Sequence, residues 1–530
     1  MAEKLTNEQQ AAVDSRERSL LVSAAAGSGK TKVLVERLFS YVEREGANLD
    51  DFLIITYTRA AASELRGKIA KALTERMERD PANYHLRQQM LRVYRADIKT
   101  VDAFCTALLR ENCHLLGEDA RGHALRPDFR VLDENEAQVL RERVLARTLD
   151  DFYGRLTTGS TLLADTLGAG RDDSALEDLV LELHAKLQAQ PYEDKWLEAQ
   201  RAFWRAVPDK IEDTPYGKIL LNEVRRKARH CKNLLQRAAQ EMCANDALNQ
   251  KYAPAFLDAS YQLEALEGKT AEGWDAARGV TIAFPRLAAV KDSDGGEMKA
   301  RMKSLWDNCK ETVKGFAEIF SASSDEAVED LRTMASAMLA LIDLTADFSR
   351  RYNEEKRRRN SADFSDQEHE AIRLLIGEDG APTELARIVS ARYREIMVDE
   401  YQDTNEVQNR IFDAISCKGE NLFTVGDVKQ SIYRFRLADP RIFLQHYNTW
   451  PPLEDAEERD SAKLLLSRNF RSRKEVLDAT NFIFCNILSE EMGELDYGAD
   501  EMLRLGANYV ESSACGAEFH LLDLPTQTGE

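Results

Sequence analysis

The chain has 530 residues, more than one hydrophobic core usually serves, so we expect at least two domains. Hydrophobic residues make up 43%, charged residues 31%, and the low count of Gly (26) and Pro (12) excludes collagenous and low-complexity chains. The formal net charge of −20 argues against a protein that is basic over its whole surface, but it leaves room for a local basic groove.

The composition also bears on the compartment. Eight cysteines are scattered along the chain without a C-x-x-C pair, so we expect reduced thiols rather than disulfides or a zinc site. No apolar run approaches the ~20 residues of a membrane span, and the N-terminus is polar and lacks the apolar core of a signal peptide. These features predict a cytoplasmic protein without membrane contact.

Short apolar runs alternate with helical patterns over the first 110 residues. Leu20–Val22 and Phe52–Ile55 are predicted to be buried strands, each followed by a helix, which is typical of a parallel α/β sheet. From about 132 to 360 the apolar residues recur at helical spacing, as in the stripe Leu176, Leu179, Val180, Leu183 and Leu187.

Strand patterns return after this helical block. They occur at Ile396–Val398, Leu422–Val425 and Leu464–Leu466, so the block is inserted into an α/β domain whose strands come from both sides of it. The predicted organisation is an α/β domain formed by residues 1–110 and 361–450, a mainly helical insertion at 111–360, and the start of a second α/β domain at 451–530.

A basic run, Lys356-Arg357-Arg358-Arg359, stands where the helical block ends. It has the charge to grip phosphate, but a solvated helix end is the favoured interpretation.

The segment Ala24-Ala25-Ala26-Gly27-Ser28-Gly29-Lys30-Thr31 matches the P-loop pattern, with Ala24 in the place often held by glycine. Small residues let backbone N–H groups approach the phosphates, a lysine reaches the β- and γ-phosphates, and a threonine holds Mg²⁺. A strand precedes the loop and a helix-compatible segment follows it, which favours a phosphate cradle over a Gly/Ser turn that happens to contain Lys-Thr.

Two carboxylates follow the strand Ile396–Val398. Asp399 is expected to hold Mg²⁺, and Glu400 to orient and deprotonate an attacking water, because ligands of α/β sheets bind at the carboxyl ends of strands. On its own this pattern is weak, since many strands end in acids, but it becomes strong beside a P-loop.

A third motif, Gly426 to Arg436, follows the strand Leu422–Val425. Its Gln430 suits the sensing of a γ-phosphate, and its aromatic and basic residues suit the stacking of bases and the binding of a strand backbone. The alternative is an amphipathic edge with exposed arginines.

Together, Asp399–Asn405, Gly426–Arg436 and Asn469–Ser472 resemble the motifs of superfamily 1 DNA helicases of the UvrD/RecB type. Asp363-Phe364-Ser365-Asp366 and Leu466–Arg473 bring the resemblance closest to AddA-type helicase/nuclease subunits. The resemblance implies an α/β fold: a P-loop NTPase, RecA-like parallel-sheet motor domain with a large inserted all-helical subdomain and the start of a second RecA-like domain.

The resemblance also implies a set of nucleotide contacts. Leu5–Gln10 is similar to an adenine-recognition motif, so Gln9 would read the adenine edge, with Arg37 beside the base or ribose and Phe470 stacked on adenine. With the residues named above, the implied ATP-binding set is Gln9, Ala24, Ala25, Ala26, Gly27, Ser28, Gly29, Lys30, Thr31, Arg37 and Phe470.

Four residues are expected to carry the chemistry. The resemblance adds Arg471, as an arginine finger, to Lys30, Glu400 and Gln430, while Thr31 and Asp399 would hold Mg²⁺.

A separate set is implied for DNA. Ile54–Arg59 resembles the loop that touches single-stranded DNA, with Tyr57 against a base and Thr58 beside it. Phe435 and Arg436 resemble a pair that stacks on, and charge-pairs with, the strand.

The function implied is that of an ATP-dependent, 3′-to-5′ DNA helicase and translocase of a helicase–nuclease complex in double-strand-break repair, binding single-stranded and duplex DNA and an AddB-type subunit. In that family a second motor domain and a nuclease follow, so the chain is interpreted as the N-terminal portion of a longer protein. Two alternatives stay open: a UvrD-like repair helicase without a nuclease, and a non-catalytic, motor-like DNA-binding subunit.

Overall fold

The computed structural model describes residues 5–118, 121–155, 157–167, 174–416, 419–509, 516–518 and 520. They divide into two compact units. The first contains Met1–Thr148, Leu181–Glu193 and Asp347–Glu530, and the second contains Leu149–Val180 and Asp194–Ala346. The sequence of residues 517–522 also predicts a strand, but this segment lies largely outside the described residues.

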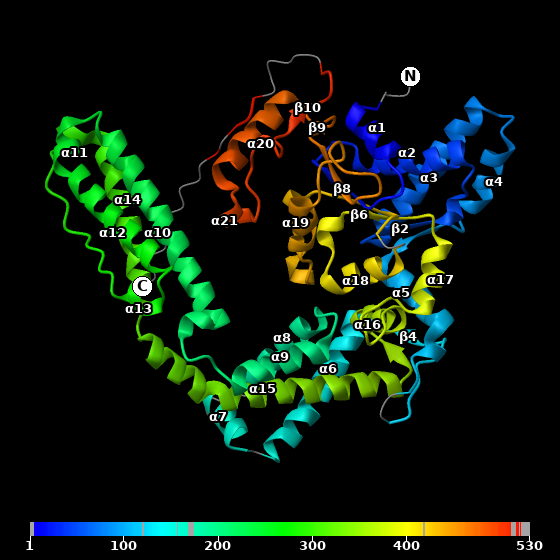
Figure 1. The fold of residues 1–530 in the computed structure, drawn as a ribbon, viewed down its shortest axis with the longest axis horizontal. Helices are drawn as coiled ribbons and strands as arrows, with labels where there is room; N and C mark the ends of the chain where they lie inside the picture. Colours follow the sequence, from blue (N-terminus) through cyan, green and yellow to red (C-terminus); the bar gives the residue numbers. More distant parts are fainter. Residues whose placement is uncertain are drawn as a thin grey trace. The chain divides into compact units, whose positions relative to one another are not determined.

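A six-stranded parallel sheet forms the centre of the first unit (Figure 1). Its strand order is β3-β2-β6-β7-β1-β8. The strands are β1 (Leu20–Ala24), β2 (Phe52–Thr56), β3 (Asp97–Thr100), β6 (Glu395–Asp399), β7 (Leu422–Gly426) and β8 (Ala462–Leu466). Strands from both ends of the sequence interleave, which confirms the predicted α/β fold with a helical insertion.

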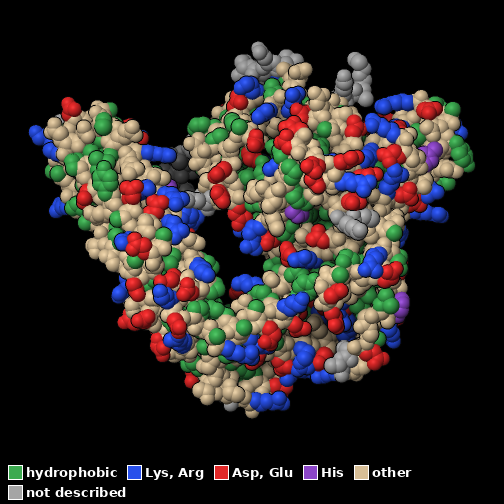
Figure 2. All heavy atoms as spheres, viewed as in Figure 1, with side chains coloured by type: hydrophobic (Ala, Val, Ile, Leu, Met, Phe, Trp, Pro, Cys, Tyr) green, Lys and Arg blue, Asp and Glu red, His purple; other side chains and the backbone are tan. Residues whose placement is uncertain are grey.

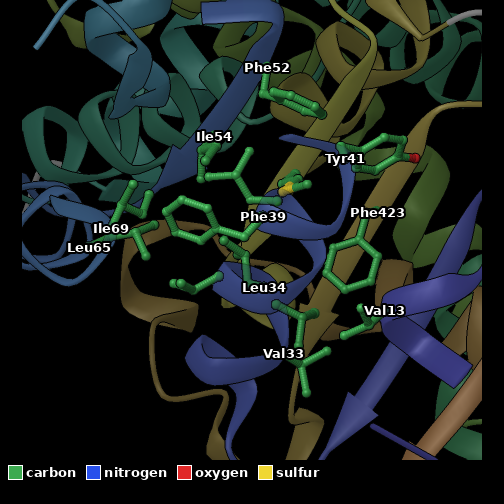
Figure 3. Close-up of a cluster of buried hydrophobic side chains, with 14 of the residues drawn as sticks. Val13, Val33, Leu34, Phe39, Tyr41, Phe52, Ile54, Leu65, Ile69 and Phe423 are labelled. Atoms are coloured by element: carbon green, nitrogen blue, oxygen red, sulfur yellow. The ribbon is translucent and has the colours of Figure 1, made fainter. Parts of the chain in front are cut away.

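Helices cover both faces of this sheet because its strands are apolar on both sides. Leu20 and Val22 of β1 belong to one buried cluster, whereas Leu21 between them belongs to the other. The first cluster is shown in Figure 3, where Val33, Leu34 and Phe39 of one helix meet Phe52, Ile54 and Phe423 of the sheet. Its helices are α1 (Asn7–Asp14), α2 (Lys30–Glu45), α3 (Arg59–Arg79) and α4 (Tyr84–Arg92). The opposite layer is α5 (Val101–Asn112), α16 (Phe364–Leu375), α17 (Glu384–Arg392), α18 (Glu406–Ile415) and α19 (Pro440–Thr449).

The position of β8 differs from the prediction. A second α/β domain was expected to begin at residue 451, but β8 pairs in parallel with β1, from Leu20 opposite Ala462 to Ala24 opposite Leu466. Ala462 and Leu466 are buried in the same core as α1 to α4, so this strand is the edge strand of the six-stranded sheet, beside β1. The elements that follow are β9 (Arg468–Asn469), α20 (Lys474–Ile487), α21 (Glu490–Gly493) and β10 (Arg504–Leu505), with β9 and β10 paired in parallel.

The second unit is helical. Helices α10, α12 and α14 run side by side (Figure 1). In the core between them the rings of Phe256 and Trp306 stack, with centroids 4.8 Å apart. The other helices of this unit are α7 (Thr158–Leu167), α9 (Glu193–Arg205), α11 (Asp246–Lys251) and α13 (Trp274–Arg278), besides α10 (Pro215–Met242), α12 (Ala253–Lys269) and α14 (Asp292–Ile319). Three helices are divided between the two units: α6 (Glu134–Tyr153), most of which belongs to the first, α8 (Ser174–Gln188) and α15 (Ser324–Arg358).

The unit is smaller than the predicted insertion at 111–360. Residues 181–193 belong to the first unit because the end of α8 packs there: His184 stacks edge-on against Phe348 and Tyr352, and the ring of His369 is 2.9 Å from the carbonyl oxygen of Gln190.

The basic run at the end of α15 is only partly a solvated helix end. Arg358 is exposed and pairs with Glu355, as a solvated helix end should. Lys356 is instead buried, and its Nζ lies 2.8 Å from Asp363 and 2.7 Å from Asp366. The two carboxylates belong to the capping box that starts α16, so Lys356 joins two helices rather than binding phosphate from solvent.

The surface carries charges of both signs, and the described cysteines are reduced. On the face seen in Figure 2, Lys and Arg side chains are interspersed with Asp and Glu. Within the described ranges no helix combines the length and apolar character needed to span a bilayer. The described cysteines Cys105, Cys113, Cys231, Cys243, Cys309 and Cys485 are free thiols.

Candidate functional site

The P-loop joins β1 to α2. Gly29 precedes the first turn of α2 with φ +85°, and Gly27 has φ +69°, both in the left-handed region that favours glycine. A Cβ at Gly27 would lie 2.8 Å from Nδ2 of Asn469 and 2.9 Å from Cβ of Arg471. Glycine is therefore needed here both for the backbone conformation and for the close approach of the 469–471 segment.

A cavity of about 480 Å³ opens beside this loop. Within it Nζ of Lys30 is 3.0 Å from a carboxylate oxygen of Glu400, which also accepts a hydrogen bond from Nε2 of Gln402 at 2.9 Å. The cavity is lined by Ala26, Gly27, Gly29, Lys30, Thr31, Lys32, Val35, Lys68, Glu400, Gln430 and Arg471. Eight of these residues were predicted, and the five with side-chain roles, Lys30, Thr31, Glu400, Gln430 and Arg471, thus come together at one place.

The two carboxylates sit where β6 ends. Burial, and then the negative charge of Glu400, raise the pKa of Asp399 to about 6, against the opposing effect of Lys30. Glu400 has φ +54°, an uncommon conformation for a residue with a Cβ. Such strain persists only where the surrounding structure enforces it, and here it accompanies a carboxylate that lines the cavity.

Gln430 is oriented by a neighbouring acid. Its Nε2 donates to Asp427 at 2.7 Å, and the backbone N–H of Asp427 donates to Oε1 of Gln402 at 2.9 Å. Gln402 therefore contacts both Glu400 and the loop that carries Gln430, so the two predicted residues share one hydrogen-bond network.

A second cavity, of about 190 Å³, borders the P-loop at Ser28. Gln9 lines it, while its Nε2 donates to the carbonyl oxygen of Ser28 at 2.9 Å and its Oε1 accepts from the N–H of Thr6 at 3.0 Å. The hydroxyl of Ser28 is buried without a hydrogen-bond partner among the described residues. The lining residues are Thr6, Glu8, Gln9, Ser28, Leu465, Leu466, Ser467, Arg468, Phe470, Asp500 and Arg504.

Arg37 lines neither of these two cavities, so the structure gives no support to its predicted place beside the base or ribose. Its guanidinium is fully buried, with Nε and Nη2 at 2.8 Å and 2.5 Å from the two carboxylate oxygens of Glu395 and Nη1 donating to the carbonyl oxygen of Ala12. The inward face of α2 points at the sheet here, and Arg37 connects α2 to β6.

Sequence reasoning missed several lining residues. Lys32 directly follows the P-loop, and that adjacency was a signal for it. Lys68 lies on α3 well after β2, and Asp500 and Arg504 follow α21, where no motif marked them.

The predicted DNA-contacting residues follow two strands of the sheet. Tyr57 and Thr58 come after β2, and Phe435 comes after β7, with only β6 between those strands. Tyr57 is half-buried against the core, and its hydroxyl is 2.5 Å from Oγ1 of Thr404. The Oγ1 of Thr58 accepts from the N–H of Ala61 at 3.0 Å and so caps α3.

Phe435 is 75% exposed, which excludes a role in the core. It lies in the short 3-10 helix Arg434–Arg436, with its ring 5.7 Å from that of Tyr433. The side chain of Arg436 lies outside the described part of the structure.

The arrangement fits a nucleoside triphosphate with Mg²⁺. The larger cavity offers backbone N–H groups, cations and the hydroxyl of Thr31, with the carboxylate of Asp399 beside Glu400. The smaller cavity offers an aromatic ring and the amide of Gln9, which suits a base. No cluster of three or more His, Cys, Asp or Glu side chains within the described residues forms a separate metal site.

Comparisons with known proteins agree with this picture. The family model for the UvrD/REP helicase N-terminal domain matches residues 5–451. The chain is 35% identical to an ATP-dependent helicase/nuclease subunit of Ruminiclostridium cellulolyticum, over 99% of this chain and 43% of that protein. It is 36% identical to the subunit of the same name from Acetivibrio thermocellus and 37% identical to that from Desulfitobacterium hafniense, over 98% of this chain and 42% and 39% of theirs. The chain thus spans about two fifths of the length of these relatives.

Proposed function

The chain belongs to the UvrD/REP helicase family, and from that membership we propose that the complete protein is an ATP-driven motor on single-stranded DNA. The observation that carries the proposal is the convergence of Lys30, Thr31, Glu400, Gln430 and Arg471 on one cavity beside the P-loop. These residues come from β1–α2, the end of β6, the loop after β7 and the segment after β9.

Each residue has a role that its chemistry supports. The ammonium of Lys30 neutralises charge on the β- and γ-phosphates, and the guanidinium of Arg471 stabilises charge that develops on the transferred phosphoryl group. Glu400 orients the attacking water and accepts its proton. Gln430, held by Asp427, reports the presence of the γ-phosphate.

Thr31 and Asp399 are the residues that would hold Mg²⁺. When bound, the ion neutralises phosphate charge. The base would enter the smaller cavity against Phe470, with Gln9 at its edge.

DNA would bind along the carboxyl edge of the sheet. The exposed ring of Phe435 is available to stack on a base, which tolerates any sequence. Tyr57 offers a second aromatic surface, and Arg436 a cation for the strand backbone.

The names of the relatives support a finer proposal. From these names we infer a helicase–nuclease subunit. From the resemblance of the chain's motifs we also infer that it travels 3′ to 5′, unwinds duplex DNA during double-strand-break repair and pairs with an AddB-type subunit. The nuclease would lie in the part of those proteins that this chain does not cover.

Glu400→Gln tests the hydrolytic site. The amide keeps the shape of the carboxylate but cannot accept a proton, so ATP should still bind while turnover falls by roughly two to four orders of magnitude. Equilibrium ATP binding and phosphate release are measured on the complete protein. If ATP affinity collapses together with the rate, Glu400 supports the structure and another group activates the water.

A further inference from the structure

A buried asparagine joins the P-loop to the segment that carries Arg471. Asn469 ends β9 and is 2% exposed. Its Nδ2 donates to the carbonyl oxygen of Ala26 at 2.6 Å, and its Oδ1 accepts from the backbone N–H groups of Arg471 at 2.8 Å and Ser472 at 2.7 Å. One side chain therefore fixes both a P-loop peptide and the turn that leads to Arg471.

Backbone hydrogen bonds on either side of Asn469 extend this contact. The N–H of Ala25 donates to the carbonyl oxygen of Leu466 at 3.0 Å, and the N–H of Phe470 donates to that of Gly27 at 2.9 Å. Three consecutive P-loop residues, 25 to 27, are thus held by the segment 466–470.

The orientation of these peptides matters for phosphate binding. A P-loop holds phosphate through backbone N–H groups, and a carbonyl oxygen turned toward the phosphate would repel it. Each of the carbonyls of Ala26 and Gly27 is held by a donor from residues 469–470. Holding the carbonyl of Ala26 on one side keeps the N–H of the same peptide, which belongs to Gly27, available on the other, whereas the N–H of Ser28 already donates to the carbonyl oxygen of Ala25 at 3.1 Å. Asn469 supplies one of these donors, and the backbone of Phe470 supplies the second.

We propose that Asn469 is a positioning residue for ATP hydrolysis: its amide nitrogen sets the phosphate cradle, and its amide oxygen sets the place of Arg471 beside that cradle. This inference rests on the ATPase function proposed above. Asparagine suits the position because it combines a donor and an acceptor on a short side chain. Aspartate would keep the acceptor for Arg471 and Ser472 but would place an oxygen against the carbonyl of Ala26, and alanine would lose both.

A matched control lies nearby on α20. Asn481 is also buried, at 8% exposure, and also makes three hydrogen bonds: its Nδ2 donates to the carbonyl of Leu503 at 3.0 Å, and its Oδ1 accepts from the N–H of Leu503 at 2.9 Å and the hydroxyl of Tyr497 at 2.7 Å. None of these partners belongs to the P-loop.

The experiment compares Asn469→Asp, Asn469→Ala, Asn481→Asp and Asn481→Ala in the complete protein. Melting temperature, the Kd for Mg-ADP, and kcat and KM for ATP in the presence of single-stranded DNA are measured for each. We expect Asn469→Asp to raise Kd and KM about 10- to 100-fold with kcat within a few-fold of wild type, because it leaves the carbonyl of Ala26 unpaired. We expect Asn469→Ala to lower kcat about 10-fold as well, because the turn of Arg471 loses its anchor.

The Asn481 variants should lose thermal stability to a similar degree and keep the kinetic constants of the wild type. If the Asn469 variants change Kd, KM and kcat no more than the Asn481 variants do, the positioning role is overturned while the proposed ATPase stands. If the wild-type protein itself binds Mg-ADP but never turns over ATP, the proposed function is overturned, and the positioning role with it.

Discussion

Arg37 shows how a charge can be used for structure beside a nucleotide site. It pairs with both carboxylate oxygens of Glu395. Both side chains are buried, so water cannot replace either partner if the other is removed. Removing one member of such a pair leaves an uncompensated buried charge, which costs far more than breaking an exposed pair.

Arg37→Ala should therefore lower the free energy of unfolding by about 3–5 kcal/mol, while the folded protein keeps its ATP affinity. The control is Arg44→Ala on the same helix, because Arg44 forms an exposed pair with Asp14 at 2.6 Å, worth about 0–1 kcal/mol. Denaturant unfolding and ATP binding are measured for both variants. If Arg37→Ala lost ATP affinity while its stability stayed unchanged, Arg37 would contact the nucleotide rather than support the fold.

Glu368 gives a second residue-scale prediction. It is buried on α16, where it accepts hydrogen bonds from Gln408 at 2.7 Å and Asn405 at 3.4 Å. Burial, with a smaller contribution from the negative charge of Asp102, raises its pKa from 4.5 to about 7. The folded protein holds this proton more tightly than the unfolded chain, so the stabilising contribution is full below pH 4.5 and is lost as the pH rises to 7.

Glu368→Gln imitates the protonated form and removes this dependence. The variant should be more stable than wild type at pH 8, by up to about 3 kcal/mol, and the difference should shrink as the pH is lowered toward about 5. Unfolding free energies at the two pH values test this, with Glu384→Gln as an exposed control. A difference that is constant with pH would show that Glu368 is ionised in the fold throughout the range.

At the scale of elements, local signals were sufficient for most of the sheet. The apolar runs before Ala24 and Asp399 predict β1 and β6, and the Gly-rich loop predicts the start of α2, because strand, turn and helix chemistry act over a few residues. The place of β8 beside β1 could not be predicted in this way, since pairing between segments so far apart in the sequence leaves no local pattern. The same applies to Lys356 and Arg37, whose carboxylate partners come from other elements.

In the candidate site, too, residues within a motif could be predicted from the sequence, whereas contacts between distant segments could not. Most residues that line the phosphate cavity could be named from motifs because each motif is contiguous. Asn469 was part of a motif, but its contact with Ala26 depends on the approach of β9 to the P-loop, which only the fold supplies. Lys68 and Arg504 carry no motif at all.

The ring of Phe435, which lies in the short 3-10 helix Arg434–Arg436, is predicted to stack on a base of single-stranded DNA. Phe435→Ala should weaken single-strand binding roughly 5- to 150-fold, because stacking is worth about 1–3 kcal/mol per base. Its melting temperature and its ATP affinity without DNA should barely change, since the ring is exposed and Gln430 is a separate side chain. Tyr84→Ala removes a similarly exposed aromatic ring (71%) from α4 and serves as the control. Equal DNA affinity in the two variants would refute the stacking role.

At the scale of the whole molecule, both cavities lie in the first unit. The same unit contains Arg471 and the residues predicted to contact DNA, among them Tyr57 and Phe435. The larger cavity touches the ends of β1 and β6 and the loop after β7, and Phe435 lies on the continuation of that same loop. The proposed ATP and DNA sites are therefore connected through one short segment, 427–436, and in the proposed function this segment couples DNA binding to ATP hydrolysis.

DNA-stimulated release of phosphate from ATP, measured on the complete protein and its Lys30→Ala variant, tests this account most directly. In the proposed function the ammonium of Lys30 neutralises phosphate charge, and the side chain does not belong to the buried core, so the variant should keep the wild-type melting temperature and lose turnover. Lys71→Ala, which removes an exposed lysine from α3, should behave as wild type. Turnover by Lys30→Ala within a few-fold of wild type, or wild-type turnover that single-stranded DNA does not change, would contradict the account.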